Sequence, residues 1–265
     1  MLLDHFIKNA AIQDEIEIPG GWGQGRAIFG GLVGALLVAR AQHLVNDASK
    51  ILKSASISFV GPVLSEKAIL NAQILRSGKS VTSVQVQLIQ NDQVQSVLVA
   101  SFGNARESMI QIASQTTDPQ LTARDQLQPM PFIEGMTPEF FKHFDVYWAE
   151  GDMPFMAAKQ PDFAGWMRLK PSEQVESIQL PHLFALVDMW PPSVLPMFNR
   201  IAPASSLSWN LDLIQLPAHI KGDAWWQYKV KTEYAADGYA FTQATIWDEQ
   251  GQLVAMSRQT VTVFL

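Results

Sequence analysis

The chain has 265 residues, of which 48% are hydrophobic and 17% are charged, so it can form one large or two small globular domains. The net charge is −6, and without a basic surplus neither nucleic acid nor an anionic membrane is expected as a main partner. There are no cysteines, which excludes disulfides, thiolate metal sites and cysteine nucleophiles. No apolar run reaches the roughly 18 residues that a membrane span needs, and no signal peptide is apparent, so we expect a cytoplasmic protein.

A glycine-rich loop begins the first patterned segment and continues into an apolar helix. The loop reads GWGQG from Gly21 to Gly25, but Ile28 stands where a dinucleotide-binding G-x-G-x-x-G loop has its third glycine. From Gly30 to about Val45 apolar residues recur at helical spacing, and small residues occupy much of the helix surface. Each glycine costs a helix about 1 kcal/mol relative to alanine. We therefore expect a buried helix with a sheet pressed against it.

Alternating apolar and polar residues then predict a run of antiparallel strands over 54–60, 68–76, 80–89 and 94–103. The sequence SGKS (77–80) is similar to the end of a phosphate-binding P-loop. That loop requires a glycine at position 73, which is Gln73 here, so SGKS is expected to be a hairpin turn. The five histidines show no metal-ligand spacing.

Residues 107–138 change character: they are rich in Gln, Thr, Pro and Asp and predict a linker. The second half then repeats the plan of the first. A short apolar helix is predicted over 176–190, ended by two prolines, and strands over 205–216, 225–235, 240–248 and 253–264. Gly78 and Gly238 mark equivalent hairpins, which indicates an internal duplication.

Three stretches resemble the double-hot-dog acyl-CoA thioesterases of the TesB-like type: GWGQGRAIFGG, ILRSGKSVTSVQVQLIQNDQ and WDEQGQLVAMSRQ. The resemblance implies an α+β fold, a double hot-dog with two tandem units, each a central helix wrapped by an antiparallel sheet. The units would be residues 1–110 and 139–265, with 111–138 as linker. The loop glycines would then keep the entrance to the first helix open around a substrate.

The resemblance also implies a mechanism, in which a carboxylate, a hydroxyl and a glutamine bind the water that attacks an acyl-CoA thioester. The matching positions are Asp188, Ser206 and Gln259, with Ser205 or Ser208 in place of Ser206 if the strand register slips. Asp188 is notable without the family, because its helix is apolar and burial would raise the pKa of a carboxylate toward that of a useful base. For Asp188 the alternatives are a solvent-facing helix end or a cap for the Pro191 turn, and for the other two residues they are ordinary polar strand positions.

Substrate contacts are expected from Phe29, Gly30, Gly31 and Trp190. The resemblance implies an acyl-CoA substrate, no metal and no organic cofactor, and the exposed sheet edges and faces favour a homodimer or larger even oligomer. Three other interpretations remain open: a non-catalytic acyl-CoA or fatty-acid binding protein on the same fold, a hot-dog dehydratase or hydratase, and a structural assembly protein. The dehydratase chemistry uses an aspartate–histidine pair, which the predicted second helix does not clearly provide.

Overall fold

The computed structural model describes residues 2–264 and contains, in that range, three α-helices and two antiparallel sheets. The helices are α1 (Leu3–Ile12), α2 (Gly30–Val45) and α3 (Leu180–Val187), with 3-10 turns η1 (Arg124–Gln126), η2 (Glu139–His143), η3 (Pro171–Glu173) and η4 (Leu195–Met197). The strands of the first half are β1 (Glu15–Glu17), β2 (Gly23–Gln24), β3 (Ala27–Ile28), β4 (Ile51–Phe59), β5 (Lys67–Ser77), β6 (Val81–Gln90) and β7 (Gln93–Gly103). Those of the second half are β8 (Phe144–Glu150), β9 (Phe163–Leu169), β10 (Ala204–Leu213), β11 (Trp226–Ala236), β12 (Tyr239–Asp248) and β13 (Leu253–Val263).

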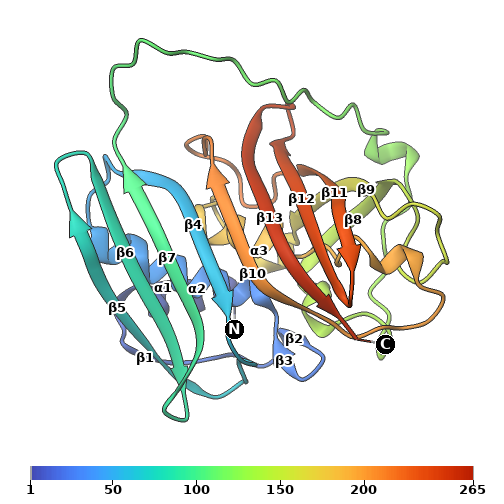
Figure 1. Cartoon of the computed structure of the whole chain (residues 1–265), viewed down its shortest axis with the longest axis horizontal. Coiled ribbons are helices and arrows are strands. Elements are labelled where there is room, and N and C mark those ends of the chain that lie inside the picture. Colours follow the sequence, from blue (N-terminus) through green and yellow to red (C-terminus); the bar gives the residue numbers. More distant parts are fainter. Residues whose placement is uncertain (1, 265) are drawn as a thin grey trace.

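Eleven of the strands form one continuous sheet, in the order β1-β5-β6-β7-β4-β10-β13-β12-β11-β9-β8 (Figure 1). The two halves of the chain join where β4 pairs antiparallel with β10, with Ser58 opposite Ser208 and Ser54 opposite Asp212. Each half therefore contributes a run of antiparallel strands to a shared sheet. This is the predicted arrangement of two helix-and-sheet units.

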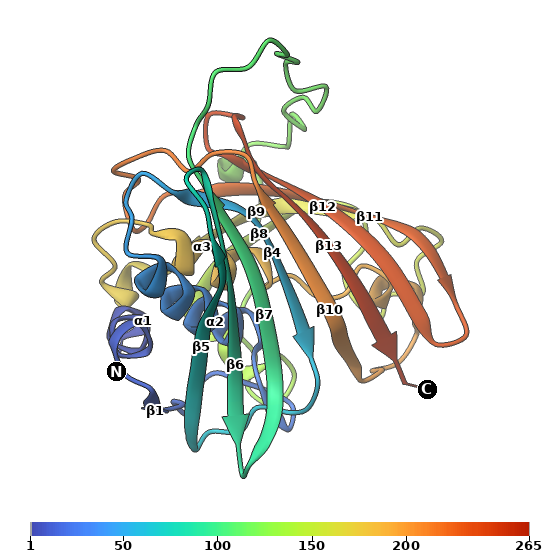
Figure 2. The same ribbon diagram turned by 60° about the vertical axis from the view of Figure 1, so that its left-hand side comes forward.

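The sheet curves around the helices: α2 lies against the strands of the first half (Figure 2), and α3 packs against α2 and contacts β9 of the second half. Helix α2 packs against both α1 and α3. Most residues of α2 and all residues of α3 are buried, because both helices are apolar on nearly every side. The helices and the inner face of the sheet thus enclose the main hydrophobic core.

The glycines of α2 lie where other elements approach its backbone most closely. A Cβ added at Gly34 would lie 2.9 Å from the Trp209 ring on β10 and 3.2 Å from the Phe184 ring on α3. One turn earlier, a Cβ at Gly31 would lie 3.0 Å from the Cβ of Asp188. The predicted contact with the sheet is confirmed, and the glycines also allow α3 to approach α2 closely, a contact that was not predicted.

The second half differs from its predicted elements in two places. Helix α3 is shorter than the predicted 176–190, because its start is fixed by a reciprocal capping pair: Gln179 caps the His182 backbone, and His182 caps the Gln179 N–H. It ends at Asp188, before the two prolines. Strands β8 and β9 were not predicted; β9 is buried at nearly every position and therefore lacks the alternation by which the other strands were identified.

The segment between the halves crosses one end of the sheet and then docks on the second half (Figures 1 and 2). The guanidinium of Arg124 lies 4.9 Å from the ring centre of Trp166 and 4.8 Å from that of Trp225, within cation–π distance. Further along, the Met130 N–H donates to the Val146 carbonyl of β8 at 2.8 Å. The segment thereby covers part of the β8 edge, which would otherwise present unpaired backbone groups.

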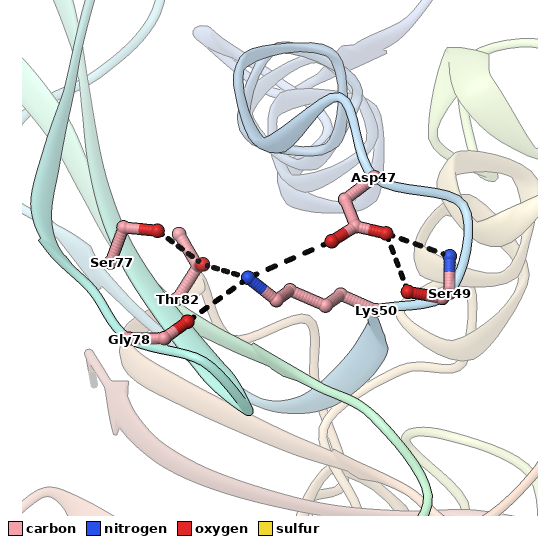
Figure 3. A network of polar contacts seen from close by, with 6 residues as sticks. All are labelled: Asp47, Ser49, Lys50, Ser77, Gly78 and Thr82. Carbon is pink, nitrogen blue, oxygen red and sulfur yellow. Dashed lines mark hydrogen bonds and ion pairs between the residues drawn. The ribbon is translucent and has the colours of Figure 1, made fainter.

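The SGKS turn is confirmed as the β5–β6 hairpin, and a lysine from outside it ties it to the loop after α2 (Figure 3). The Nζ of Lys50 lies 3.0 Å from the Thr82 hydroxyl, 3.2 Å from the Gly78 carbonyl and 3.6 Å from the Asp47 carboxylate. Asp47 also accepts hydrogen bonds from the hydroxyl and N–H of Ser49, which lower its pKa. This network joins the chain that leaves the C-terminal end of α2 to the hairpin, so it belongs to the framework.

Candidate active site

Asp188, Gln259 and Ser206 form one hydrogen-bonded chain. Asp188 is the C-terminal cap of α3, Gln259 lies on β13 and Ser206 on β10. The Gln259 amide Nε2 donates to Asp188 Oδ1 at 2.6 Å, and the Ser206 hydroxyl donates to Gln259 Oε1 at 3.2 Å. The structure thus brings the three predicted residues together, although 71 and 53 residues separate the two pairs along the chain.

A β-bulge decides which residue of β10 reaches Gln259. Trp209 lies directly opposite Gln259 and is buried, so both face inward. Regular alternation would turn Leu207 inward as well, but the register shifts between Ser206 and Ser208. Because one extra residue reverses the alternation, Ser206 shares the inner face and Leu207 is 40% exposed.

Burial makes Asp188 a base suited to neutral pH. Removal from water raises the pKa of its carboxyl from 3.8 to about 7, because the charged form loses hydration. The hydrogen bond from Gln259 opposes this rise, and the backbone N–H of Gly31 opposes it more weakly. Asp188 nevertheless keeps part of its surface accessible to solvent. The carboxyl can therefore exchange a proton near pH 7 with a group that approaches from outside.

The N-terminus of α2 supplies the other wall of the site. A Cβ at Gly30 would lie 2.8 Å from Asp188 Oδ2 and 3.3 Å from the Phe59 ring, so only glycine leaves the second carboxylate oxygen unobstructed. Among the described residues, the Gly30 N–H makes no hydrogen bond. A helix N-terminus carries partial positive charge, which favours an anionic oxygen beside these glycines.

The aromatic residues predicted to contact substrate are both buried. Phe29 is 0% exposed and stacks on Phe140, with ring centres 4.0 Å apart. Trp190 donates to the Met167 sulfur at 3.0 Å and stacks on Tyr228 at 5.1 Å. Their substrate role therefore stays a prediction.

Two features of the site were not predicted from the sequence: the backbone N–H of Gly31 as a donor to Asp188 and the phenol of Tyr228. Burial and, to a lesser degree, the negative charge of Asp188 raise the pKa of Tyr228, so its hydroxyl stays protonated. The amino-acid sequence does not indicate which backbone N–H, here that of Gly31, will donate to a side chain. Tyr228 could have been suspected only from its place on an inward strand position.

The loop glycines are less open than expected. A Cβ at Gly21 would contact the Lys142 side chain at 3.5 Å, and one at Gly23 would contact the Glu139 carboxylate at 3.3 Å. Both partners belong to η2 of the second half, and only Gly25 of the three has free space around it. The loop is therefore held against η2.

Neither metal ligands nor a surface hollow identify the site. Within residues 2–264, no group of three His, Asp or Glu side chains could hold a metal ion, and no helix is long and apolar enough to cross a membrane. Two recesses of about 760 and 590 Å³ are lined by residues 157 and 197–200 and by residues 107–109. Neither recess is lined by Asp188, Gln259 or Ser206, so the site is recognised by the hydrogen bonds among these three residues.

Solved structures of similar architecture share the fold at low sequence identity. A conserved protein of unknown function with hot dog fold from Alicyclobacillus acidocaldarius has a TM-score of 0.83 at 17% identity, over 98% of both chains. A tesB protein of Mycobacterium avium subspecies paratuberculosis gives 0.74 at 14% identity, over 98% of this chain and 99% of that one. Acyl-CoA thioesterase II TesB2 of Mycobacterium marinum gives 0.70 at 18% identity, over 88% of each chain. No curated protein sequence matches this chain.

Two family models cover most of the sequence. The acyl-CoA thioesterase N-terminal domain matches residues 18–103, and the acyl-CoA thioesterase C-terminal domain matches residues 124–263. The predicted resemblance is confirmed: the chain belongs to the acyl-CoA thioesterase family, thioester hydrolases with the double hot-dog fold.

Proposed function

We propose that this protein hydrolyses an acyl-CoA thioester to the free acid and CoA, with Asp188 as the general base. The observation that carries the proposal is the carboxyl of Asp188, whose pKa of about 7 places it at the pH where a base works best. Its hydrogen bond to Gln259 fixes one oxygen and leaves Oδ2 facing the space beside Gly30.

In the proposed reaction, Asp188 removes a proton from water as the water oxygen attacks the thioester carbonyl carbon. Ser206 fixes the Gln259 amide, and Gln259 in turn orients the carboxylate and the water. The oxyanion that develops would be stabilised by the N–H of Gly30 at the N-terminus of α2. When the C–S bond breaks, the proton held by Asp188 passes to the departing CoA thiolate, which restores the base.

The test is thiol release from a panel of short, medium and long acyl-CoA substrates by wild type and Asp188→Asn. The variant keeps shape and hydrogen bonding but removes the base, so we expect a loss of about 10²- to 10⁴-fold in rate. Undiminished turnover by Asp188→Asn would refute the assignment of the base. A folded wild type that binds acyl-CoA and hydrolyses none of the panel would favour the binding-protein interpretation. A homodimeric assembly, a cytoplasmic location and the predicted unit boundaries at 110 and 139 stay predictions.

A further inference from the structure

A half-buried histidine joins four segments of the chain just outside the proposed site. His143, at the end of η2, places Nε2 2.9 Å from the Gly21 carbonyl and Nδ1 2.7 Å from Glu173 Oε1. The other oxygen of Glu173 accepts from the Leu3 N–H at 3.3 Å. Trp22 stacks on the His143 ring, with centres 3.9 Å apart and planes within 4°. We refer to His143, Glu173, Gly21, Trp22 and Leu3 as the His143 cluster.

The hydrogen bonds of the His143 cluster decide where its protons lie. The Gly21 carbonyl can only accept, so Nε2 of His143 must carry a hydrogen. Glu173 accepts the Leu3 N–H at the first turn of α1. A carboxylate can only accept, so Nδ1 of His143 carries a hydrogen in its bond to Glu173. The stacked Trp22 face favours the resulting positive charge.

His182 provides an internal contrast. Its Nδ1 accepts the Gln179 N–H at 2.9 Å, so only Nε2 can carry a hydrogen, which it donates to Asp4 at 2.8 Å. Burial lowers the pKa of His182 and outweighs the opposing effect of Asp4. The two histidines with carboxylate partners therefore differ in their backbone partner: a backbone N–H donates to His182, whereas His143 faces a backbone carbonyl that can only accept.

The His143 cluster is linked to the catalytic carboxylate through the loop before α2. The Trp22 carbonyl accepts the Phe29 N–H at 2.9 Å, and Phe29 is the residue at which α2 begins. No side chain among residues 2–264 caps this end of α2. The loop that His143 holds is therefore one of the contacts that place this end of the helix, and two residues later the Gly31 N–H contacts Asp188.

We propose that His143 is a positioning residue: as an imidazolium between Glu173 and the Gly21 carbonyl, it fixes the glycine loop and so aims the N-terminus of α2 at Asp188. The charged groups beside it on η2 are Glu139 and Lys142, which pair with each other at 2.9 Å. Glu139 also interacts electrostatically with His143, and Glu173 is the carboxylate that is hydrogen-bonded to its ring. The effect on turnover rests on the proposed function, whereas the charge state of His143 and the effect on Asp188 do not.

The first measurement is ¹⁵N NMR of the histidine rings in the full-length wild type at pH 7. We expect both ring nitrogens of His143 to show the shifts of protonated nitrogens. His182 should show one protonated nitrogen and one unprotonated nitrogen in the same spectrum. An unprotonated Nδ1 in His143 would overturn the inference, whatever the enzyme assay shows.

The second measurement compares Glu173→Gln with Asp145→Asn, a control that removes a carboxylate paired with Arg168 two residues beyond His143. In folded Glu173→Gln, His143 should lose one ring proton. The ¹³C-detected titration midpoint of Asp188 should move upward, because the stabilising Gly31 contact weakens. The value of kcat/KM should fall by about 10- to 100-fold, as expected when reacting groups shift by about an ångström. Asp145→Asn should leave all three readouts at wild-type values.

The outcomes separate the two proposals. An unchanged Asp188 midpoint in folded Glu173→Gln would refute the positioning role. If wild type lacks thioesterase activity, the proposed function fails, while the ring shifts of His143 and the Asp188 midpoint still decide the inference. If Glu173→Gln does not fold, the wild-type ring spectrum decides the charge of His143. The variant His143→Gln then replaces Glu173→Gln in the Asp188 titration. An unmoved Asp188 midpoint in that variant would again refute the positioning role.

Discussion

Replacing Asp188 by asparagine should stabilise the protein at alkaline pH while it slows hydrolysis. The folded protein raises the pKa of this carboxyl from 3.8 to about 7, so it favours the neutral form. The stabilising contribution of that neutral form is complete below pH 3.8 and is lost as the pH rises through about 7. At 1.36 kcal/mol for each tenfold change in proton affinity, the full loss is about 4 kcal/mol. Asparagine stays neutral and does not incur this loss.

Urea unfolding of wild type and Asp188→Asn at pH 5 and pH 8 measures the effect. All other titrating groups are common to both proteins and largely cancel in the difference. Linkage with these two pKa values gives a gain for the variant that is about 2 to 3 kcal/mol larger at pH 8 than at pH 5. Over the same range the wild-type rate should rise with pH and level off above about 7, as the base loses its proton. A stability difference that does not vary with pH would refute the burial argument.

Three further substitutions and one matched control test individual contacts. Gln259→Ala should cost less activity than Asp188→Asn, because in the proposed mechanism Gln259 orients the base and is not itself the base; steady-state thiol release compares the two variants. Gly30→Ala places a methyl group 2.8 Å from Asp188 Oδ2, so turnover should fall by about 10-fold or more with little change in the melting temperature. Gly34→Ala is the matched control on the same helix. It should destabilise the protein by about 1–3 kcal/mol through overpacking of the core, while the protein that remains folded stays active. Lys50→Met should lower the free energy of unfolding by about 1–3 kcal/mol without affecting kcat. The reason is that the Thr82 hydroxyl and the Gly78 carbonyl lose the ammonium group that donates to them. A variant as stable as wild type would show that the network is dispensable.

The sequence predicted those parts of the fold that have a local pattern. The bounds of α2 and the β5–β6 hairpin follow from helical spacing and turn residues, and both are confirmed. Asp188 could be selected because a carboxylate in so apolar a helix is unusual. The bulge that turns Ser206 inward, the Gly31 N–H and the pairing of His143 with Glu173 could not be predicted. Each depends on the register or approach of segments far apart in the chain, and the residue types involved are ordinary at such positions.

The seam between β4 and β10 has a consequence for how such a chain can evolve. In a dimer of two identical subunits, every substitution appears on both sides of the interface. The same sequence must then provide both the base and the residues that face it. Here the wall at Gly30 and Gly31 comes from one half and Asp188 from the other. Each half can therefore change without its counterpart, and two fragments cut in the connecting segment should regain the site only by associating along the β4–β10 ladder.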